Sequence, residues 1–205
     1  MNINITGFQE KVNRYHAWRN ELDLVYKVLI ALGFAALTGL LAQARIGLPF
    51  TPVPVTGQTF AVLLAGIMLG RLGALSMGMY VGLGAAGIPW FTNMQGGIGY
   101  LTGATGGYLF GFILAAGFIG YMTERYVSTG KIGHLVPILL VANFLIIYLP
   151  GLLVLHTWWS SFVGPMGLLQ LLSVGLLPFM VGDLMKIALV AGIAKISLPS
   201  VQYQD

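Results

Sequence analysis

Long apolar stretches, separated by short segments rich in glycine and proline, make up most of the chain from Leu24 onward. A helix that crosses a membrane needs about 20 apolar residues. We therefore expect helices over residues 24–44, 58–70, 72–86, 104–126, 135–156 and 168–196. Prolines predict kinks at Pro150 in the fifth helix and near Pro178 in the sixth. The predicted fold class is all-α, an integral membrane bundle of six transmembrane helices.

The connection 47–57, after the first predicted helix, contains three closely spaced prolines, Pro49, Pro52 and Pro54. Prolines at this density exclude a helix. The segment is either a lid over an outward-facing pocket or a rigid turn that joins two spans. Gln58, which follows it, either caps the second helix or reaches a ligand.

Positive charges between the apolar stretches give the orientation, because Lys and Arg are enriched in cytoplasmic loops. With the N-terminus inside, eight of the ten Lys and Arg lie on the inner side: Lys11, Arg14, Arg19, Lys27, Arg71, Arg125, Lys131 and Lys195. Arg45 falls outside, and Lys186 lies within a helix. We therefore predict a multi-pass protein of the cytoplasmic (inner) membrane with both termini in the cytoplasm. Its parts are an N-terminal arm (1–23), a substrate-binding domain (24–196) and a tail (197–205).

The composition narrows the class of protein further, since 57% of the 205 residues are hydrophobic and 8% are charged. Ordinary soluble domains carry roughly 25% charged residues. The net charge of +4 is scattered between apolar runs, which argues against a nucleic-acid partner. The absence of cysteine excludes disulfides and thiolate sites. The sequence also lacks an ATP-binding Gly-x-x-x-x-Gly-Lys-Ser/Thr motif, so uphill transport would need a partner or an ion gradient.

The sixth predicted helix contains an ionisable pair, Asp183 and Lys186. Charged groups inside a membrane are costly, so they usually face a cavity and mark a functional site. Their spacing of three residues puts them on one face of the helix. A carboxylate accepts N–H bonds from a cyclic urea or amide, and an ammonium holds a ligand carboxylate. The alternative is that the two groups pair only to lower the cost of insertion.

Two glycine-rich stretches on the outer side supply aromatic and amide groups. Trp90, Phe91 and Asn93 precede the fourth predicted helix, and a Thr-Gly-Gly-Tyr run ending at Tyr108 lies near its start. Glycines permit a close approach of backbone, and apolar walls with a few polar groups are typical of small-molecule sites. The alternative is interfacial anchoring by the aromatic residues together with tight turns.

A stripe of small residues, Ala31, Ala35 and Gly39, recurs at four-residue spacing in the first predicted helix. Small residues in this register let another helix approach closely. Both internal packing and the docking of a membrane partner fit the pattern.

These motifs, in this order, resemble the BioY family of biotin transporters, the substrate-specific S components of energy-coupling factor (ECF) importers. The resemblance covers nearly the whole chain after the arm, and its most specific parts are residues 49–59, 70–80, 87–89, 105–108 and 178–186. It implies six helices around a biotin pocket near the outer face, roofed by the connection between the first two helices. It also implies partners, a transmembrane coupling protein docked on the small-residue stripe and a pair of cytoplasmic ATPases. The ligand is biotin, and no cofactor is implied.

The resemblance further implies roles for single residues. Asp183 and Asn93 are expected at the ureido ring of biotin, and Lys186 at its valerate carboxylate. Trp90, Phe91 and Tyr108 are expected around the bicyclic ring and the chain. The other expected substrate-binding residues are Gln58, Tyr80, Gly106 and Gly107. Where family members often have a proline or a basic residue this chain has Ala104, so carboxylate binding is expected to rest on Lys186 and backbone donors.

Three other functions stay open beside a binding subunit for biotin uptake. The same scaffold could serve another small vitamin that carries an amide and an acid group. A small intramembrane enzyme acting on lipids would need paired carboxylates or a histidine near the interface. Asp183, the single acid well inside a predicted span, argues against it. A channel would need a continuous polar path, which one Asp–Lys pair does not make. We therefore expect a binding protein and not an enzyme.

Overall fold

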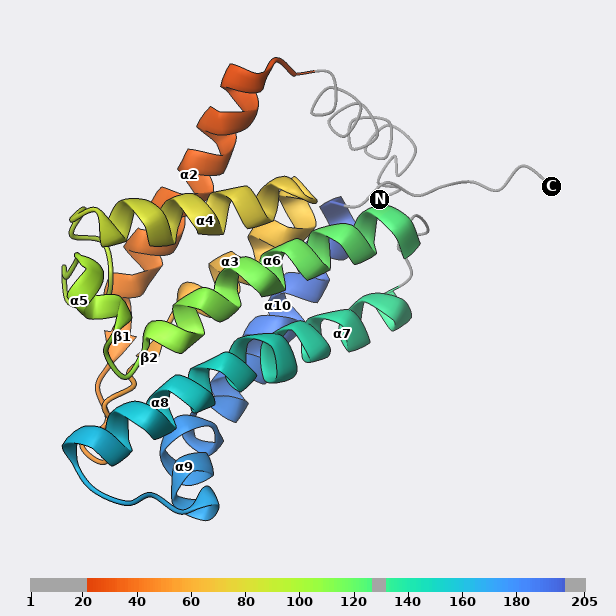
Figure 1. Cartoon of the computed structure of the whole chain (residues 1–205). Coiled ribbons are helices and arrows are strands. Elements are labelled where there is room, and N and C mark those ends of the chain that lie inside the picture. Colours follow the sequence, from red (N-terminus) through yellow and green to blue (C-terminus); the bar gives the residue numbers. More distant parts are fainter. Residues whose placement is uncertain (1–21, 127–131, 198–205) are drawn as a thin grey trace.

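The computed structural model describes residues 22–126 and 132–197 of the chain, and its fold is all-α, as predicted (Figure 1). The α-helices are α2 (Leu24–Gln43), α3 (Gln58–Leu69), α4 (Leu72–Ala85), α5 (Ile98–Leu101), α6 (Gly106–Tyr126), α7 (Ile132–Leu140), α8 (Tyr148–Phe162), α9 (Leu168–Gly175) and α10 (Met180–Ser197). A π-helical turn, Val141–Ile147, joins α7 to α8. A 3₁₀ turn, Leu177–Phe179, joins α9 to α10. After α2 the chain forms a two-stranded antiparallel sheet, β1 (Arg45–Ile46) with β2 (Val55–Thr56).

α4, α6 and the α7–α8 segment run side by side between two ends of the molecule, whereas α2 is steeply inclined to α4 (Figure 1). α6 lies among them and packs against α3, α4, α8 and the π-helical turn. The short elements β1, β2 and α5 gather at one end, which we call the outer end (Figure 1). The turn between α3 and α4, at Gly70 and Arg71, lies at the opposite, inner end.

Most helix predictions are confirmed closely. The sixth predicted helix is disturbed near Pro178 as expected, but it is divided into α9 and α10 rather than kinked. The fifth predicted helix is longer than expected, because α8 continues to Phe162. Its kink also differs, since the irregular turn precedes Pro150. A proline clashes with the carbonyl four residues earlier, here that of Ile146, which lies within the π-helical turn. The predicted N-terminal arm and C-terminal tail fall almost wholly on residues 1–21 and 198–205, outside the described residues.

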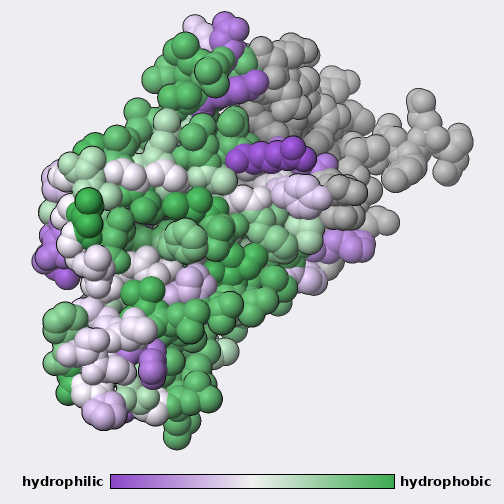
Figure 2. Space-filling view, in the orientation of Figure 1, coloured by the Kyte–Doolittle hydropathy of each residue, from purple (hydrophilic) through white to green (hydrophobic). Residues whose placement is uncertain are grey.

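Within residues 22–126 and 132–197, four helical segments are long and apolar enough to cross a membrane: Leu24–Gln43, Gly106–Glu124, His134–Phe162 and Leu168–Lys195. α3 and α4 have 12 and 14 residues, shorter than the roughly 20 that a complete span requires. The surface seen in Figure 2 is predominantly hydrophobic along the helices, with polar residues mainly toward the ends. The described residues thus have the character of a multi-pass membrane protein, although six complete spans are not confirmed.

The small-residue stripe of α2 lies inside the molecule. Ala31 and Ala35 are fully buried, and α2 packs against α4. The hydroxyl of Ser76 in α4 donates a hydrogen bond of 2.7 Å to the carbonyl of Ala31. A Cβ atom added to Gly39 would lie 2.9 Å from the Cβ of Trp90. In this structure the stripe serves internal packing, and a partner cannot reach it while α2 and α4 stay together.

Candidate functional site

The break between α9 and α10 places Asp183 in the first turn of α10. The N-terminus of a helix favours a negative charge, because its backbone N–H groups point outward. Asp183 is only 2% exposed. Lys186, one turn further along α10, donates a hydrogen bond of 2.9 Å from Nζ to Asp183 Oδ1. The ionisable pair predicted from the sequence is therefore formed inside the bundle.

Three uncharged side chains complete the environment of this carboxylate. Thr59 in α3 donates to Oδ1 at 3.2 Å and accepts from Lys186 Nζ at 2.9 Å. On the other oxygen, Asn143 Nδ2 donates to Oδ2 at 2.9 Å and the Tyr148 hydroxyl donates at 2.6 Å. Together with Lys186 they supply four donors, about the number that a carboxylate can accept. A buried charge is tolerated when it is paired and hydrogen-bonded in this way.

An inner cavity of about 60 Å³ lies beside this cluster. Its lining includes the charged residues Asp183 and Lys186 and the polar residues Thr59, Tyr148 and Gln58. The rest of its wall is formed by Val53, Pro54, Thr56, Thr92, Tyr100, Thr105, Tyr108, Leu109, Phe112, Ile147 and Phe179. A mostly apolar wall with a few convergent polar groups is the usual make-up of a small-molecule site.

A larger hollow of about 770 Å³, which we call the vestibule, lies at the outer end. Its lining comes from residues 45–54, residues 92–105 and Trp158. It shares four wall residues with the inner cavity, namely Pro54, Thr92, Tyr100 and Thr105. The charged residue in this lining is Arg45, whose guanidinium donates a hydrogen bond of 2.7 Å to Asn93 Oδ1.

The proline-rich connection between β1 and β2 contributes to the walls of both spaces. Thr51 in this connection donates a hydrogen bond of 2.7 Å to the carbonyl of Val174 in α9. Val53 and Pro54 face the inner cavity, and Leu48, Thr51 and Pro52 face the vestibule. Because this connection forms part of the walls of both spaces, its position fits the lid hypothesis better than that of a simple turn between two spans.

Four of the predicted site residues, Asp183, Lys186, Tyr108 and Gln58, are brought together around the inner cavity. The Tyr108 hydroxyl donates to the Gly175 carbonyl at 2.8 Å, which ties α6 to the end of α9. Gln58 Nε2 donates to the hydroxyl of Tyr80 at 2.8 Å. Tyr80 therefore lies behind Gln58 and supports the wall.

The other aromatic and amide predictions fall elsewhere. Asn93 lines the vestibule and not the inner cavity, so the structure does not bring it to Asp183. Phe91 is fully buried and stacks on Tyr100, with ring centroids 4.8 Å apart. Trp90 donates from its indole nitrogen to the Tyr80 carbonyl at 2.9 Å. Neither Trp90 nor Phe91 is among the residues that line the two spaces.

Gly106 and Gly107 were expected to let a ligand approach the backbone closely. In the structure they instead let other backbone segments of the protein approach α6. A Cβ atom at Gly106 would collide with the carbonyl of Leu101, and one at Gly107 with the carbonyl of Pro150. Both glycines are buried. In this structure they set the distance of α6 from its neighbours rather than facing an open space.

Thr59, Asn143 and Tyr148 were not singled out from the sequence. They are uncharged, and they lie 124, 40 and 35 residues from Asp183 in the chain. A polar Asn in an apolar helix is a weak signal that could have marked Asn143. Thr59 and Tyr148 carry no such signal, because threonine and tyrosine are common in membrane helices and at their ends.

Comparison with known proteins identifies relatives along nearly the whole chain. The profile of the BioY family matches residues 12–203. The chain is 44% identical over 144 residues to a probable biotin transporter BioY of Methanothermobacter thermautotrophicus, covering 69% of this chain and 92% of that one. It is 39% identical over 168 residues to the biotin transporter BioY of Thermotoga maritima, covering 78% of this chain and 89% of that one.

A solved structure shares the fold. It is the crystal structure of an S-component for biotin from an ECF-type ABC transporter, and it superposes with a TM-score of 0.73 at 24% sequence identity. The superposition covers 83% of this chain and 89% of that one.

Proposed function

The chain belongs to the BioY family, and on this premise we propose that it captures biotin as the substrate-binding S component of an importer. The observation that carries the proposal is the Asp183–Lys186 pair at the wall of a cavity inside the bundle. Ionisable residues inside a membrane-spanning bundle usually mark a functional site. Biotin offers matching chemistry, with two N–H donors and a carbonyl in its ureido ring, an apolar middle, and a carboxylate at the far end.

We propose that the ureido ring meets both members of the pair. Asp183 Oδ1 and Lys186 Nζ are 2.9 Å apart, whereas the ureido ring and the carboxylate lie at opposite ends of biotin. The Asp183–Lys186 pair is therefore compact enough to contact only one end of the ligand. The ureido ring presents a donor and an acceptor side by side, so its N–H suits Asp183 and its carbonyl suits Lys186. This revises the expectation that Lys186 holds the carboxylate.

The carboxylate end then extends into the vestibule. The inner cavity, at about 60 Å³, is smaller than the roughly 300–1,000 Å³ of typical small-molecule sites. It has room for one end of a ligand, and the remainder must occupy the adjoining vestibule. Arg45 provides a cation there, and its partner Asn93 provides an amide. In this arrangement Asn93 serves the outer part of the ligand.

We also propose the finer membrane arrangement and the partners. α3 and α4, joined at Gly70 and Arg71, would complete six spans, since both pack against the long helix α6. The termini would lie on the cytoplasmic side of the cell membrane. Energy would come from an ECF coupling protein and a pair of ATPases, a proposal supported by the structural relative, which is itself a component of an ECF-type ABC transporter. Docking through Ala31, Ala35 and Gly39 would require α2 to move away from α4.

The proposal is tested by replacing the carboxylate. Asp183→Asn removes the charge that balances Lys186 and replaces one acceptor oxygen with a donor. Hydrogen bonds to charged groups contribute about 1.5–3 kcal/mol, so biotin binding should weaken roughly tenfold to a hundredfold. Isothermal titration of the purified chain in detergent measures the change. The matched control is Asp23→Asn, which alters an exposed carboxylate before α2 and should leave the affinity unchanged. Equal affinity in both variants would contradict the proposal.

A further inference from the structure

The two oxygens of Asp183 face different surroundings. Oδ1 accepts from Thr59 and Lys186, and both of these residues line the inner cavity. Oδ2 accepts from Asn143 and Tyr148. Asn143 is fully buried and is not part of the cavity wall. Tyr148 also lines the cavity, so both donors on Oδ1 belong to its wall but only one of the two donors on Oδ2 does. Oδ1 is thus the oxygen whose partners all line the ligand space, and Oδ2 is the oxygen tied to a donor behind the wall.

The donors on Oδ2 come from an unusual piece of helix. Asn143 lies within the π-helical turn Val141–Ile147, and Tyr148 directly follows it. On an α-helix with 3.6 residues per turn, two side chains five residues apart would point about 140° away from each other. A π-helix bonds residues at i and i+5 and so brings such a pair onto one side. The wider turn is what lets both side chains reach the same oxygen.

The neighbouring sequence explains why the turn is wide at this point. Pro150 conflicts with the carbonyl of Ile146, four residues earlier. The widened turn then needs room against α6, and Gly111 supplies it. A Cβ atom at Gly111 would lie 2.7 Å from Ile147 Cα and 2.8 Å from the Ile147 carbonyl oxygen. Pro150 and Gly111 together thus place Asn143 and Tyr148 beside Asp183.

The hydrogen bonding of Asn143 indicates that its role is the contact with Asp183. Its Nδ2 donates to Asp183, while its own Oδ1 is buried without a hydrogen-bond partner among the described residues. An unpaired buried acceptor is destabilising. An amide at this position therefore lowers the stability of the fold. The contribution that offsets this loss is the hydrogen bond that the amide donates to Asp183.

We propose that Asn143 and Tyr148 are positioning residues that hold Asp183 by Oδ2, while Oδ1 is the exchangeable acceptor for the ligand. On this view the four donors in the structure have two roles. Thr59 and Lys186 occupy Oδ1 until a ligand N–H replaces the Lys186 ammonium there, and the freed ammonium turns to the ligand carbonyl. Asn143 and Tyr148 stay in place throughout. The inference rests on the proposed function, since it concerns how the biotin site is prepared.

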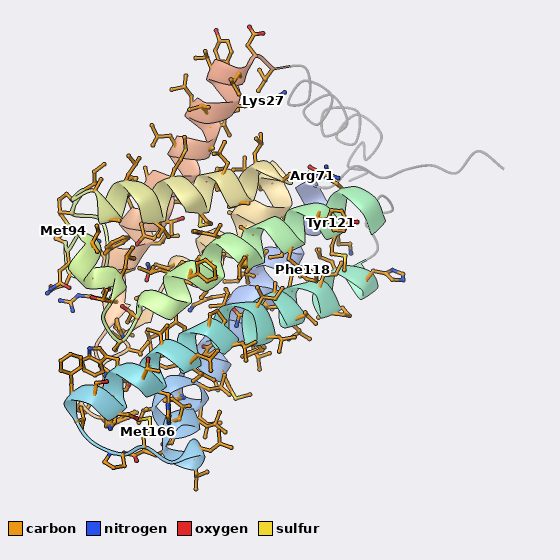
Figure 3. The ribbon with its side chains drawn as sticks, viewed as in Figure 1. Lys27, Arg71, Met94, Phe118, Tyr121 and Met166 are labelled. Atoms are coloured by element: carbon orange, nitrogen blue, oxygen red, sulfur yellow. The ribbon has the colours of Figure 1, made fainter. Side chains whose placement is uncertain are left out.

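Tyr148→Phe tests the inference with the least disturbance, because it removes one hydroxyl and keeps the ring that packs on Tyr108 and Phe144. We expect biotin affinity to fall roughly tenfold, the effect of losing one hydrogen bond to a charged group. Asn143→Leu should act in the same direction. Tyr121→Phe, at the inner end near Arg71 (Figure 3), is the matched control and should bind like the unmodified chain.

A double-mutant cycle separates positioning from a general structural effect. In an Asp183→Asn background, Tyr148→Phe should weaken binding by no more than about threefold, because the charge that Tyr148 holds is gone. A purely structural loss would give the same fold-change in both backgrounds and would overturn the inference. Unchanged affinity of Tyr148→Phe and Asn143→Leu, in chains that elute as single species, would also overturn it. If the unmodified chain itself fails to bind biotin, the proposed function is wrong, and the inference falls with it.

Discussion

At the scale of single residues, the proposed site offers the ligand two cations in different surroundings. In the described part of the chain, Lys186 lines the inner cavity and Arg45 lines the vestibule. The Lys186 side chain is 18% exposed and paired with a buried carboxylate, whereas Arg45 is exposed. Exposed ion pairs contribute only about 0–1 kcal/mol. Loss of Arg45 should therefore cost much less affinity than loss of Lys186.

This division predicts different responses to biotin and to its methyl ester. Arg45→Gln should weaken binding of biotin about two- to fivefold and leave the neutral ester almost unaffected. Lys186→Met should weaken both ligands equally, by roughly tenfold or more, because the ureido carbonyl is the same in each. Competition binding with the two ligands measures all four values. If Lys186→Met instead affects biotin alone, Lys186 holds the carboxylate, as first expected from the sequence.

The sequence identified Asp183 and Lys186 because charges stand out in an apolar stretch. It could not identify their partners, since Thr59, Asn143 and Tyr148 are uncharged and reach the cluster through the tertiary fold. Trp90 and Phe91 illustrate the opposite case. Aromatic residues beside a glycine-rich connection suit a ligand wall and a protein core equally well, and here they pack around Tyr80.

At the scale of elements, helix limits follow from the sequence more directly than helix irregularities do. The apolar stretches and the prolines predicted the limits of α2, α3 and α4, and a disturbance near Pro178, where the structure divides the helix before α10. The π-helical turn was not predicted, because it depends on how the chain around Pro150 fits against Gly111 of another helix. A proline indicates that a helix is disturbed, and the packing partner decides the form that the disturbance takes.

Gly111→Ala tests this account of the turn. The added methyl group would meet the backbone of Ile147, which cannot rotate away as a side chain can. Overpacking of this kind typically costs about 1–3 kcal/mol, so the thermal unfolding midpoint in detergent should fall. Biotin affinity should fall as well, because the turn carries Asn143 and Tyr148.

The matched control for this variant is Gly78→Ala. Gly78 lies in α4 with no atom within 4 Å of an added Cβ. Replacing such a glycine in a helix should be neutral or stabilising, by up to about 1 kcal/mol. Equal unfolding midpoints for the two alanine variants would show that the space at Gly111 is not needed.

At the scale of the whole molecule, the charged ends and the apolar sides give the chain a direction in the membrane. Arg71 pairs with Glu124 at the inner end, with a distance of 3.0 Å between Nε and Oε2. Met94 lies at the opposite end (Figure 3), between Asn93 and Gln95, which line the vestibule. The distribution of Lys and Arg along the sequence, with Arg71 and Lys195 on the predicted inner side and Arg45 on the outer side, predicts that the inner end faces the cytoplasm. The vestibule is then predicted to open outward.

The absence of cysteine makes this orientation simple to test. Met94→Cys and Lys195→Cys each introduce a single thiol at an exposed position, one at each end. A membrane-impermeant maleimide should label Met94→Cys in intact cells, and Lys195→Cys only after the membrane is permeabilised. The reverse pattern would mean that the vestibule opens to the cytoplasm.

Equilibrium binding of radiolabelled biotin to the purified chain in detergent tests the central claim most directly. Unlabelled desthiobiotin, which keeps the ureido ring and the carboxylate, and thiamine, which has neither, serve as competitors. We predict saturable binding by the chain alone, which desthiobiotin displaces and thiamine does not. A folded preparation that does not bind biotin, or from which thiamine displaces it equally well, would contradict the biotin assignment.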